Sequence, residues 1–166
     1  MKKAATFFCI LCGLLVSVRA TAGHPLEYLH GTWEGTGRTS GMVSSVRFSW
    51  GPALGGKYTT LQIQNRMSGS EGQQFLFEGI AYYLPASDAD ETSLTGVWVD
   101  NRGDILPLRA ALASGVLTAH WGSEETETGR SQYRLLDDGS LEAVDWVVNE
   151  AGEWQEFGHA ILARIP

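Results

Sequence analysis

The chain has 166 residues, of which 43% are hydrophobic, and a formal net charge of −7. This length suits one domain, and the hydrophobic fraction is that of a globular rather than a disordered protein. An acidic chain without a basic cluster repels phosphate, so the composition excludes nucleic acid as a partner. The sequence itself names neither a ligand nor a reaction.

The first 22 residues have the layout of a cleaved signal peptide. Two lysines at positions 2 and 3 precede the hydrophobic run Phe7–Val18, whose 12 residues are too few to span a bilayer as a helix. Ala20 and Ala22 are small residues of the kind that a signal peptidase reads, which predicts cleavage before Gly23. Cleavage after Ala20 and a retained membrane anchor are the alternatives. The sequence therefore predicts a periplasmic or secreted protein, with a signal peptide (1–22) followed by one domain (23–166).

Both cysteines, Cys9 and Cys12, lie inside the predicted signal peptide. The mature domain would then contain no cysteine, and neither a disulfide nor thiolate chemistry. A lipoprotein modified at Cys12 is an alternative. Cleavage would remove three basic residues and no acid, which takes the formal charge from −7 to −10. No later run is hydrophobic enough for a membrane span, so we expect no integral span in the mature chain.

The mature chain is expected to begin with one or two helical turns at His24–His30, where Pro25 suits the first helical position. Every later segment has the short, alternating pattern of strands separated by Gly, Asn and Asp. The ten expected strands are Thr32–Arg38, Val43–Trp50, Lys57–Arg66, Gln73–Leu84, Ser93–Asp100, Asp104–Ala113, Val116–Trp121, Arg130–Leu136, Ser140–Val148 and Glu153–Ile165.

The connections have the composition of hairpin turns. Ser114-Gly115 and Asp137-Asp138-Gly139 each offer a residue suited to positive φ, and Pro85–Thr92 is expected to be the longest loop. Strands joined in sequence without crossover helices form an antiparallel up-and-down meander, and closing the meander into a barrel removes its two edges. The sequence therefore predicts an all-β fold, a single antiparallel up-and-down β-barrel of about ten strands with a short N-terminal helix. A barrel of this size holds its own side chains or one small ligand.

The first expected strand opens with Gly31-Thr32-Trp33, directly after the short helix. This Gly-x-Trp pattern resembles the calycin barrels, which include lipocalins, fatty-acid-binding proteins and haem-binding nitrobindins. The resemblance implies that Trp33 plugs one end of the barrel and that a basic residue of the last strand covers it. Arg164 is the matching residue, and a guanidinium over an indole ring is a favourable cation–π pair.

Four further segments resemble, in their order and spacing, a bacterial family of uncharacterised calycin-like barrels. They are Gly55–Tyr58, Gly96–Gly103, Gly129–Tyr133 and Trp154–Ala160. The resemblance covers nearly all of 31–166. It implies a fold and supplies no activity.

The resemblance also makes His159 a candidate ligand-binding residue. In nitrobindin-like barrels a histidine near the C-terminus binds haem iron from inside the barrel, and imidazole is an ordinary axial ligand. Strand alternation puts His159 with Phe157 and Ile161 on the more apolar face, which favours an inward side chain. If Arg164 covers the barrel end from inside, however, His159 faces outward unless a β-bulge intervenes. The first strand after Gly35 also departs from the nitrobindin pattern, so haem is one alternative and a surface histidine the other, and no other cofactor is expected.

Two tryptophans are expected to line a ligand cavity. Trp121 and His120 are neighbours in one strand, so only one faces inward, and burying the indole removes more apolar area from water. Trp98 is the second candidate, on the same face of its strand as Asp100, which we interpret as a turn acceptor. The histidines His24 and His30 lie near one end of the barrel and are expected to be solvated.

Asp145 interrupts an otherwise apolar strand and is the candidate for a polar anchor in the cavity. A carboxylate on the inner wall is expected to pair with an inward arginine, such as Arg47 or Arg109. The alternative is an outward Asp on a solvated face.

The sequence contains no recognisable catalytic or metal-binding motif, so no catalytic or metal residue is assigned. The run Glu124–Glu127 is interpreted as a solvated turn rather than a calcium loop. The leading functional hypothesis is an exported barrel that binds a small hydrophobic or amphipathic ligand, with Trp and Tyr side chains as cavity walls. The alternatives are a barrel filled by its own side chains that acts through its surface, and a small hydrolase or isomerase. Inward orientation of Trp50, Trp98, Trp121 and Trp146 together would favour the filled barrel.

Overall fold

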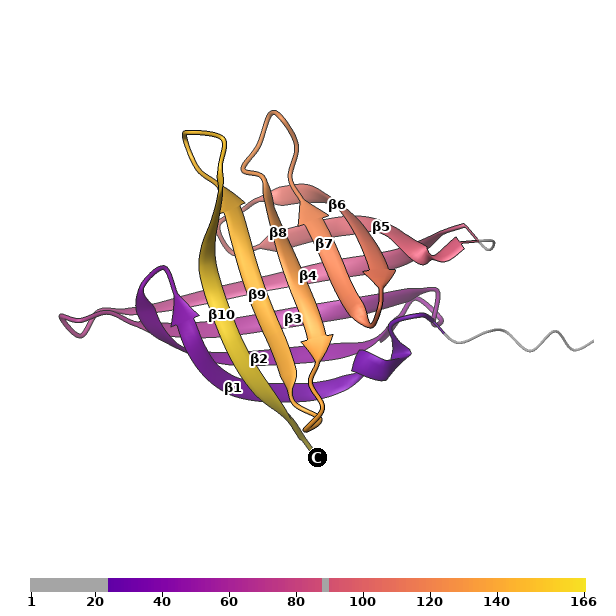
Figure 1. Ribbon diagram of the computed structural model, residues 1–166, viewed down its shortest axis with the longest axis horizontal. Helices are drawn as coiled ribbons and strands as arrows, with labels where there is room; N and C mark the ends of the chain where they lie inside the picture. Colours follow the sequence, from indigo (N-terminus) through magenta and orange to yellow (C-terminus); the bar gives the residue numbers. More distant parts are fainter. Residues whose placement is uncertain (1–23, 88–89) are drawn as a thin grey trace, which may run out of the picture.

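The computed structural model describes residues 24–87 and 90–166, so the predicted signal peptide lies outside the described residues. A 3-10 helix, η1 (Glu27–Leu29), precedes ten strands (Figure 1). The strands are β1 (Gly31–Thr39), β2 (Met42–Ala53), β3 (Tyr58–Ser68), β4 (Gln74–Ser87), β5 (Asp90–Asp100), β6 (Ile105–Ala113), β7 (Val116–Trp121), β8 (Gly129–Leu135), β9 (Leu141–Val148) and β10 (Trp154–Ile165).

The ten strands form one closed antiparallel barrel in which each strand pairs with its neighbours in sequence. The ring closes where β1 pairs with β10, with Trp33 opposite Arg164 and Thr39 opposite Gly158 (Figure 1). The predicted all-β, up-and-down barrel is therefore confirmed. No helix among residues 24–87 and 90–166 is long and apolar enough to cross a membrane.

The strand boundaries follow the hydrophobic alternation closely. In β6 the burial alternates residue by residue, with Leu106, Leu108 and Ala110 inside and their neighbours exposed. The prediction of a long loop over Pro85–Thr92 is wrong. Most of that segment belongs to strands, because β4 continues to Ser87 and β5 begins at Asp90. The acidic composition of the segment concealed the extended conformation of Pro85–Ser87 and of the start of β5.

One end of the barrel is closed by η1 and Trp33. The indole Nε1 of Trp33 donates a 2.9 Å hydrogen bond to the carbonyl of Leu29, and both side chains are buried. Arg164 lies outside this plug with its guanidinium 4.4 Å from the centre of the Trp33 ring. The same guanidinium donates to the carbonyls of His30 and Tyr28, at 2.7 and 2.8 Å. The closed end is thus held by stacking and by charge-assisted hydrogen bonds.

A layer of aromatic rings crosses the barrel above this plug. Trp50 stacks on Tyr83 with ring centroids 5.7 Å apart, and Tyr133 meets both Trp50 and Phe48 edge-on at 5.3 and 5.9 Å. Such offset and edge-to-face pairs are the favourable arrangements for aromatic rings. All four residues belong to the buried core, and Phe48 also lines the space beyond the layer.

Candidate ligand cavity

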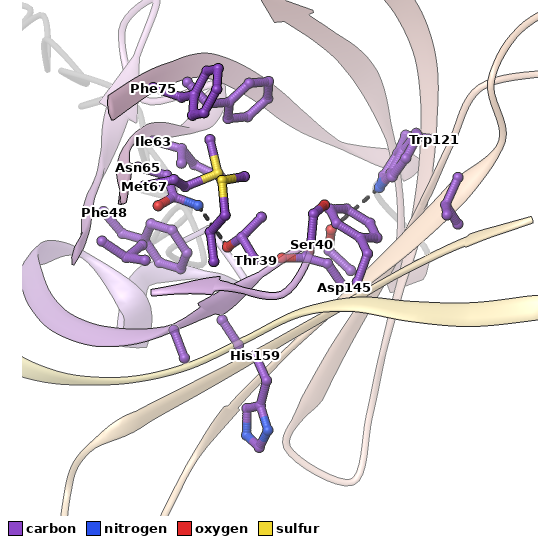
Figure 2. Close-up of a pocket in the computed structure, with 18 of the residues that line it drawn as sticks. Thr39, Ser40, Phe48, Ile63, Asn65, Met67, Phe75, Trp121, Asp145 and His159 are labelled. Atoms are coloured by element: carbon purple, nitrogen blue, oxygen red, sulfur yellow. Dashed lines mark hydrogen bonds between the residues drawn. The ribbon is translucent and has the colours of Figure 1, made fainter. Parts of the chain in front are cut away.

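A cavity of about 410 Å³ occupies the half of the barrel opposite η1 (Figure 2). The cavity begins at the aromatic layer and ends at the opposite end of the barrel. Its wall includes residues of the β7–β8 loop and of four hairpins, namely β1–β2, β3–β4, β5–β6 and β9–β10. The wall is mostly apolar. Its larger apolar side chains include Phe48, Met67, Phe75, Phe77, Trp98 and Trp121.

Glycines on adjacent strands provide space for the two cavity tryptophans. A Cβ atom on Gly79 of β4 would overlap the six-membered ring of Trp98, and one on Gly129 of β8 would overlap that of Trp121. Each indole therefore lies flat against a neighbouring strand instead of crossing the barrel. This arrangement leaves the centre of the barrel open although Trp98 and Trp121 both face inward, as the alternation predicted.

Asp145 of β9 lies on the cavity wall (Figure 2). Its neighbour across the strand pair on one side is Ser131 of β8, whose hydroxyl lies near enough to the carboxylate to favour its ionised form. Ser131 Oγ also accepts a 3.3 Å hydrogen bond from the Nε1 of Trp121. On the other side the neighbour is Gly158 of β10, where an added Cβ would lie 2.9 Å from Asp145 Oδ2. The absence of a side chain at Gly158 therefore makes room for the carboxylate.

The surroundings of Asp145 make ionisation unfavourable. Burial raises the pKa of this carboxyl from 3.8 to about 6, although the Ser131 hydroxyl acts in the opposite direction. Burial raises the pKa of both Tyr83 and Tyr133, helped by the negative charge of Asp145. These tyrosines remain neutral at physiological pH, so they supply hydroxyl dipoles and no charge.

Arg102 holds the rim of the cavity together. Its guanidinium donates to the Asp100 carboxylate at 2.9 Å and to Glu127 of the β7–β8 loop at 3.3 Å, and it lies 3.4 Å from Asp104. The side chain of Asp100 is fully buried and also accepts a 3.0 Å hydrogen bond from Trp98 Nε1. Burial alone would raise the pKa of Asp100, but the hydrogen bonds from Arg102 and Trp98 outweigh it and lower the pKa. Asp100 thus fixes Trp98 and Arg102 together, beyond the turn role predicted for it.

A second polar group lies on the opposite wall. Asn65 of β3 is buried, and its Nδ2 donates a 2.9 Å hydrogen bond to Thr39 Oγ1 (Figure 2). Its Oδ1 has no hydrogen-bond partner among the described residues. Strand alternation was the available signal for Asn65, since it shares the inward face of β3 with Leu61 and Ile63.

Of the two orientations open for His159, the inward one is wrong, and the surface histidine is the one that the structure shows. Its side chain is 47% exposed, points away from the cavity, and lies 3.3 Å from Glu142 on the outer surface (Figure 2). The register shifts between Glu156 and Gly158, so that Gly158 and Ala160 are buried and His159 is exposed. Haem binding from inside the barrel through His159 does not fit this arrangement.

The other histidines do not replace it. His24 Nε2 lies 3.2 Å from the carbonyl of Tyr83, and His30 Nε2 lies 3.0 Å from Thr59 Oγ1, both near the closed end. His120 is exposed, with its ring 6.0 Å from that of Trp154. His24 and His30 were expected to be solvated, but both are half-buried and each forms a hydrogen bond within the protein.

The prediction that Asp145 pairs with an arginine is also wrong. Arg47 faces outward and pairs with Glu34 at 2.6 Å, and Arg109 is exposed on β6. Within the described part of the chain, no ion pair involves Asp145, and no group of three or more His, Cys, Asp and Glu is arranged to hold a metal. Asp145 itself lies on the inner wall, and the sequence analysis missed its direct neighbours Ser131 and Gly158.

No protein-family model matches this chain, and no curated protein sequence matches it either. The fold is similar to that in the crystal structure of Rv2717c from M. tuberculosis, with a TM-score of 0.61 over 85% of this chain and 95% of that one. The two sequences are 14% identical, so the similarity concerns the fold alone. The ten-stranded barrel of this chain therefore shares its fold with a protein of M. tuberculosis.

Proposed function

We propose that this protein binds a small, largely apolar ligand inside its barrel. The observation that carries the proposal is the cavity of about 410 Å³, which lies within the size range of small-molecule sites. A filled barrel is the competing function. Trp146 faces outward, with Arg130 stacked 4.5 Å from its ring, and the indoles of Trp98 and Trp121 lie flat against Gly79 and Gly129. These placements favour the open barrel.

The test compares two substitutions at adjacent positions of β10. Ala160 faces the cavity, whereas Ile161 is 42% exposed on the outer surface. Binding of the neutral fluorescent probe N-phenyl-1-naphthylamine is measured for the wild type, Ala160→Phe and Ile161→Phe. We expect saturable binding to the wild type, a loss of at least tenfold in Ala160→Phe, and little change in Ile161→Phe. Absence of saturable binding to the wild type, or equal effects of both substitutions, would contradict the proposal and favour the filled barrel.

We further propose that the chain is exported and that its barrel is related to the calycins. The lysines, hydrophobic run and small residues of 1–22 support export, and the Gly31-Thr32-Trp33 pattern with Arg164 over Trp33 supports the relationship. Expression in a bacterial host followed by fractionation tests the first point. We expect the periplasmic or secreted protein to have the mass of a chain that begins at Gly23, and an intact chain in the cytoplasm would contradict it.

A further inference from the structure

The cavity wall contains an acidic side chain with no cationic partner within the described residues. Four titratable residues line the cavity, namely Arg102, Glu127, Asp145 and His159. Arg102 and Glu127 pair with each other at the rim, and the His159 side chain points outward to Glu142. Asp145 is left as the uncompensated charge of the interior.

Two neighbouring residues accommodate the Asp145 carboxylate on the cavity wall. Gly158 provides the space for the carboxylate, and Ser131, its neighbour on β8, offers one hydroxyl on the other side. One hydroxyl satisfies only part of the hydrogen-bonding capacity of a carboxylate, which has about four lone-pair sites. A ligand that donates hydrogen bonds at this point would satisfy the rest.

The rest of the wall also favours a cation. Phe48, Phe75, Trp98 and Trp121 present aromatic rings to the cavity, and a ring face attracts positive charge. The protein as a whole carries a formal charge of −7, so its long-range field favours the approach of cations over anions.

We propose that the cavity selects a ligand with a protonated amine on a compact apolar body, and that the amine donates hydrogen bonds to Asp145. This inference rests on the function proposed above and adds the chemical class of the ligand. The apolar body lies among the aromatic and methionine side chains, and the ammonium replaces the missing cation beside Asp145. An anionic amphiphile of the same size would meet an uncompensated carboxylate and bind weakly.

Three probes with the same apolar body test the selectivity. They are 2-naphthylmethylamine, 2-naphthylmethanol and 2-naphthylacetic acid, which are cationic, neutral and anionic at pH 8. Dissociation constants are measured by calorimetry for the full mature domain. We expect the amine to bind about tenfold more tightly than the alcohol, and the acid to bind most weakly, because hydrogen bonds to a charged group are among the stronger ones.

Two variants of β9 locate the effect. Asp145→Asn removes the inner charge, and Glu142→Gln removes an outward acid three residues away on the same strand. We expect Asp145→Asn to abolish the preference for the amine while the affinity for the alcohol stays within about threefold. Glu142→Gln should leave the preference unchanged.

The pH dependence of the wild type gives a test without a variant. Protonation of Asp145 between pH 7 and pH 5 should weaken binding of the amine and leave that of the alcohol unchanged. The other groups that face Asp145 are Ser131 and the neutral hydroxyls of Tyr83 and Tyr133, while Arg102 and Glu127 lie at the rim and His159 and Glu142 lie outside. A parallel measurement on His159→Gln, which should retain the profile, excludes a contribution from this exposed histidine.

The outcomes separate the two proposals. Equal affinities for amine and alcohol, or a preference for the amine that survives Asp145→Asn, would overturn the cationic ligand while leaving the binding function intact. Tightest binding of the acid would also overturn it. Failure of all three naphthyl probes and of N-phenyl-1-naphthylamine to bind would contradict the binding function itself.

Discussion

Arg164 stacks on Trp33 with 4.4 Å between the guanidinium carbon and the ring centre, and it connects the last strand to the segment before the first. The two carbonyls that it bonds belong to Tyr28 and His30, more than 130 positions earlier in the chain. One side chain therefore holds the last strand, the short helix and the indole plug in a single arrangement.

Replacing Arg164 with Ala should destabilise the barrel by about 2 kcal/mol, since it removes a cation–π contact and two hydrogen bonds from a charged donor. Urea unfolding measures the free energy change. Arg47→Ala is the matched control, because Arg47 forms an exposed ion pair with Glu34 that is worth less than about 1 kcal/mol. Equal losses in the two variants would contradict the role given to Arg164.

Gly129→Ala should displace Trp121, because the added Cβ would overlap the indole ring. We expect a loss of about 1–3 kcal/mol in the free energy of unfolding, as for other overpacked sites, and a changed near-ultraviolet circular dichroism spectrum. Gly51→Ala serves as the control, since a Cβ there meets no atom within 4 Å. A near-ultraviolet spectrum identical to that of the wild type would show that Trp121 does not depend on Gly129.

Asp145 should make the stability of the barrel fall as the pH rises. The folded state raises its pKa from 3.8 to about 6, so the folded protein binds the proton more tightly than the unfolded chain does. Stability is therefore lost between about pH 4 and pH 6 and stays low above that range. Two pKa units correspond to about 3 kcal/mol, and water that enters the cavity reduces the expected effect to about 2 kcal/mol.

The measurement compares Asp145→Asn with the wild type by urea unfolding at pH 4 and pH 8. The variant lacks the ionisation, so its stability relative to the wild type should be about 2 kcal/mol more favourable at pH 8 than at pH 4. A difference that does not change with pH would contradict the raised pKa of Asp145.

Arg102→Ala should leave the buried Asp100 carboxylate with only the Trp98 indole and the backbone N–H of residue 102 as donors. We expect a loss of about 2 kcal/mol at pH 7. The folded state lowers the pKa of Asp100, so its stabilising contribution exists above pH 3.8 and disappears as the pH falls through the folded value. The deficit of the variant should therefore shrink in acid. Arg134→Ala, which removes a more exposed pair with Glu142, should cost less at pH 7, and an equal deficit would argue against the buried contact.

The fold could be predicted from the sequence because each hairpin is encoded locally. Alternation in segments such as Leu106–Ala110 specifies which residues face inward, and turns such as Ser114-Gly115 have the positive φ angles that their composition predicts. The extent of β4 and β5 was missed because the segment between them lacks large apolar residues. Strand pairing with a neighbour, rather than local propensity, fixes the extended conformation at the end of β4 and the start of β5.

The site was less accessible to sequence reasoning. The inward positions of Trp98 and Trp121 follow from alternation. For His159, alternation with Phe157 favoured the inside and alternation with Arg164 favoured the outside, and the register shift between Glu156 and Gly158 separates His159 from Phe157. For Asp145, the sequence predicted an arginine partner. The actual neighbours are a serine and a glycine, and these are brought beside Asp145 by strand register rather than by any motif.

The pairing of β1 with β10 has a consequence for the folding reaction. All other strand pairs join neighbours in sequence, so they form from short loops with a small entropic cost. Closure instead joins strands from opposite ends of the domain, and the strands approach so closely that a Cβ on Gly35 or Gly37 would overlap the backbone of β10. We expect closure to be the last kinetic step, so that substitutions at these two glycines accelerate unfolding and leave the early formation of the meander unchanged.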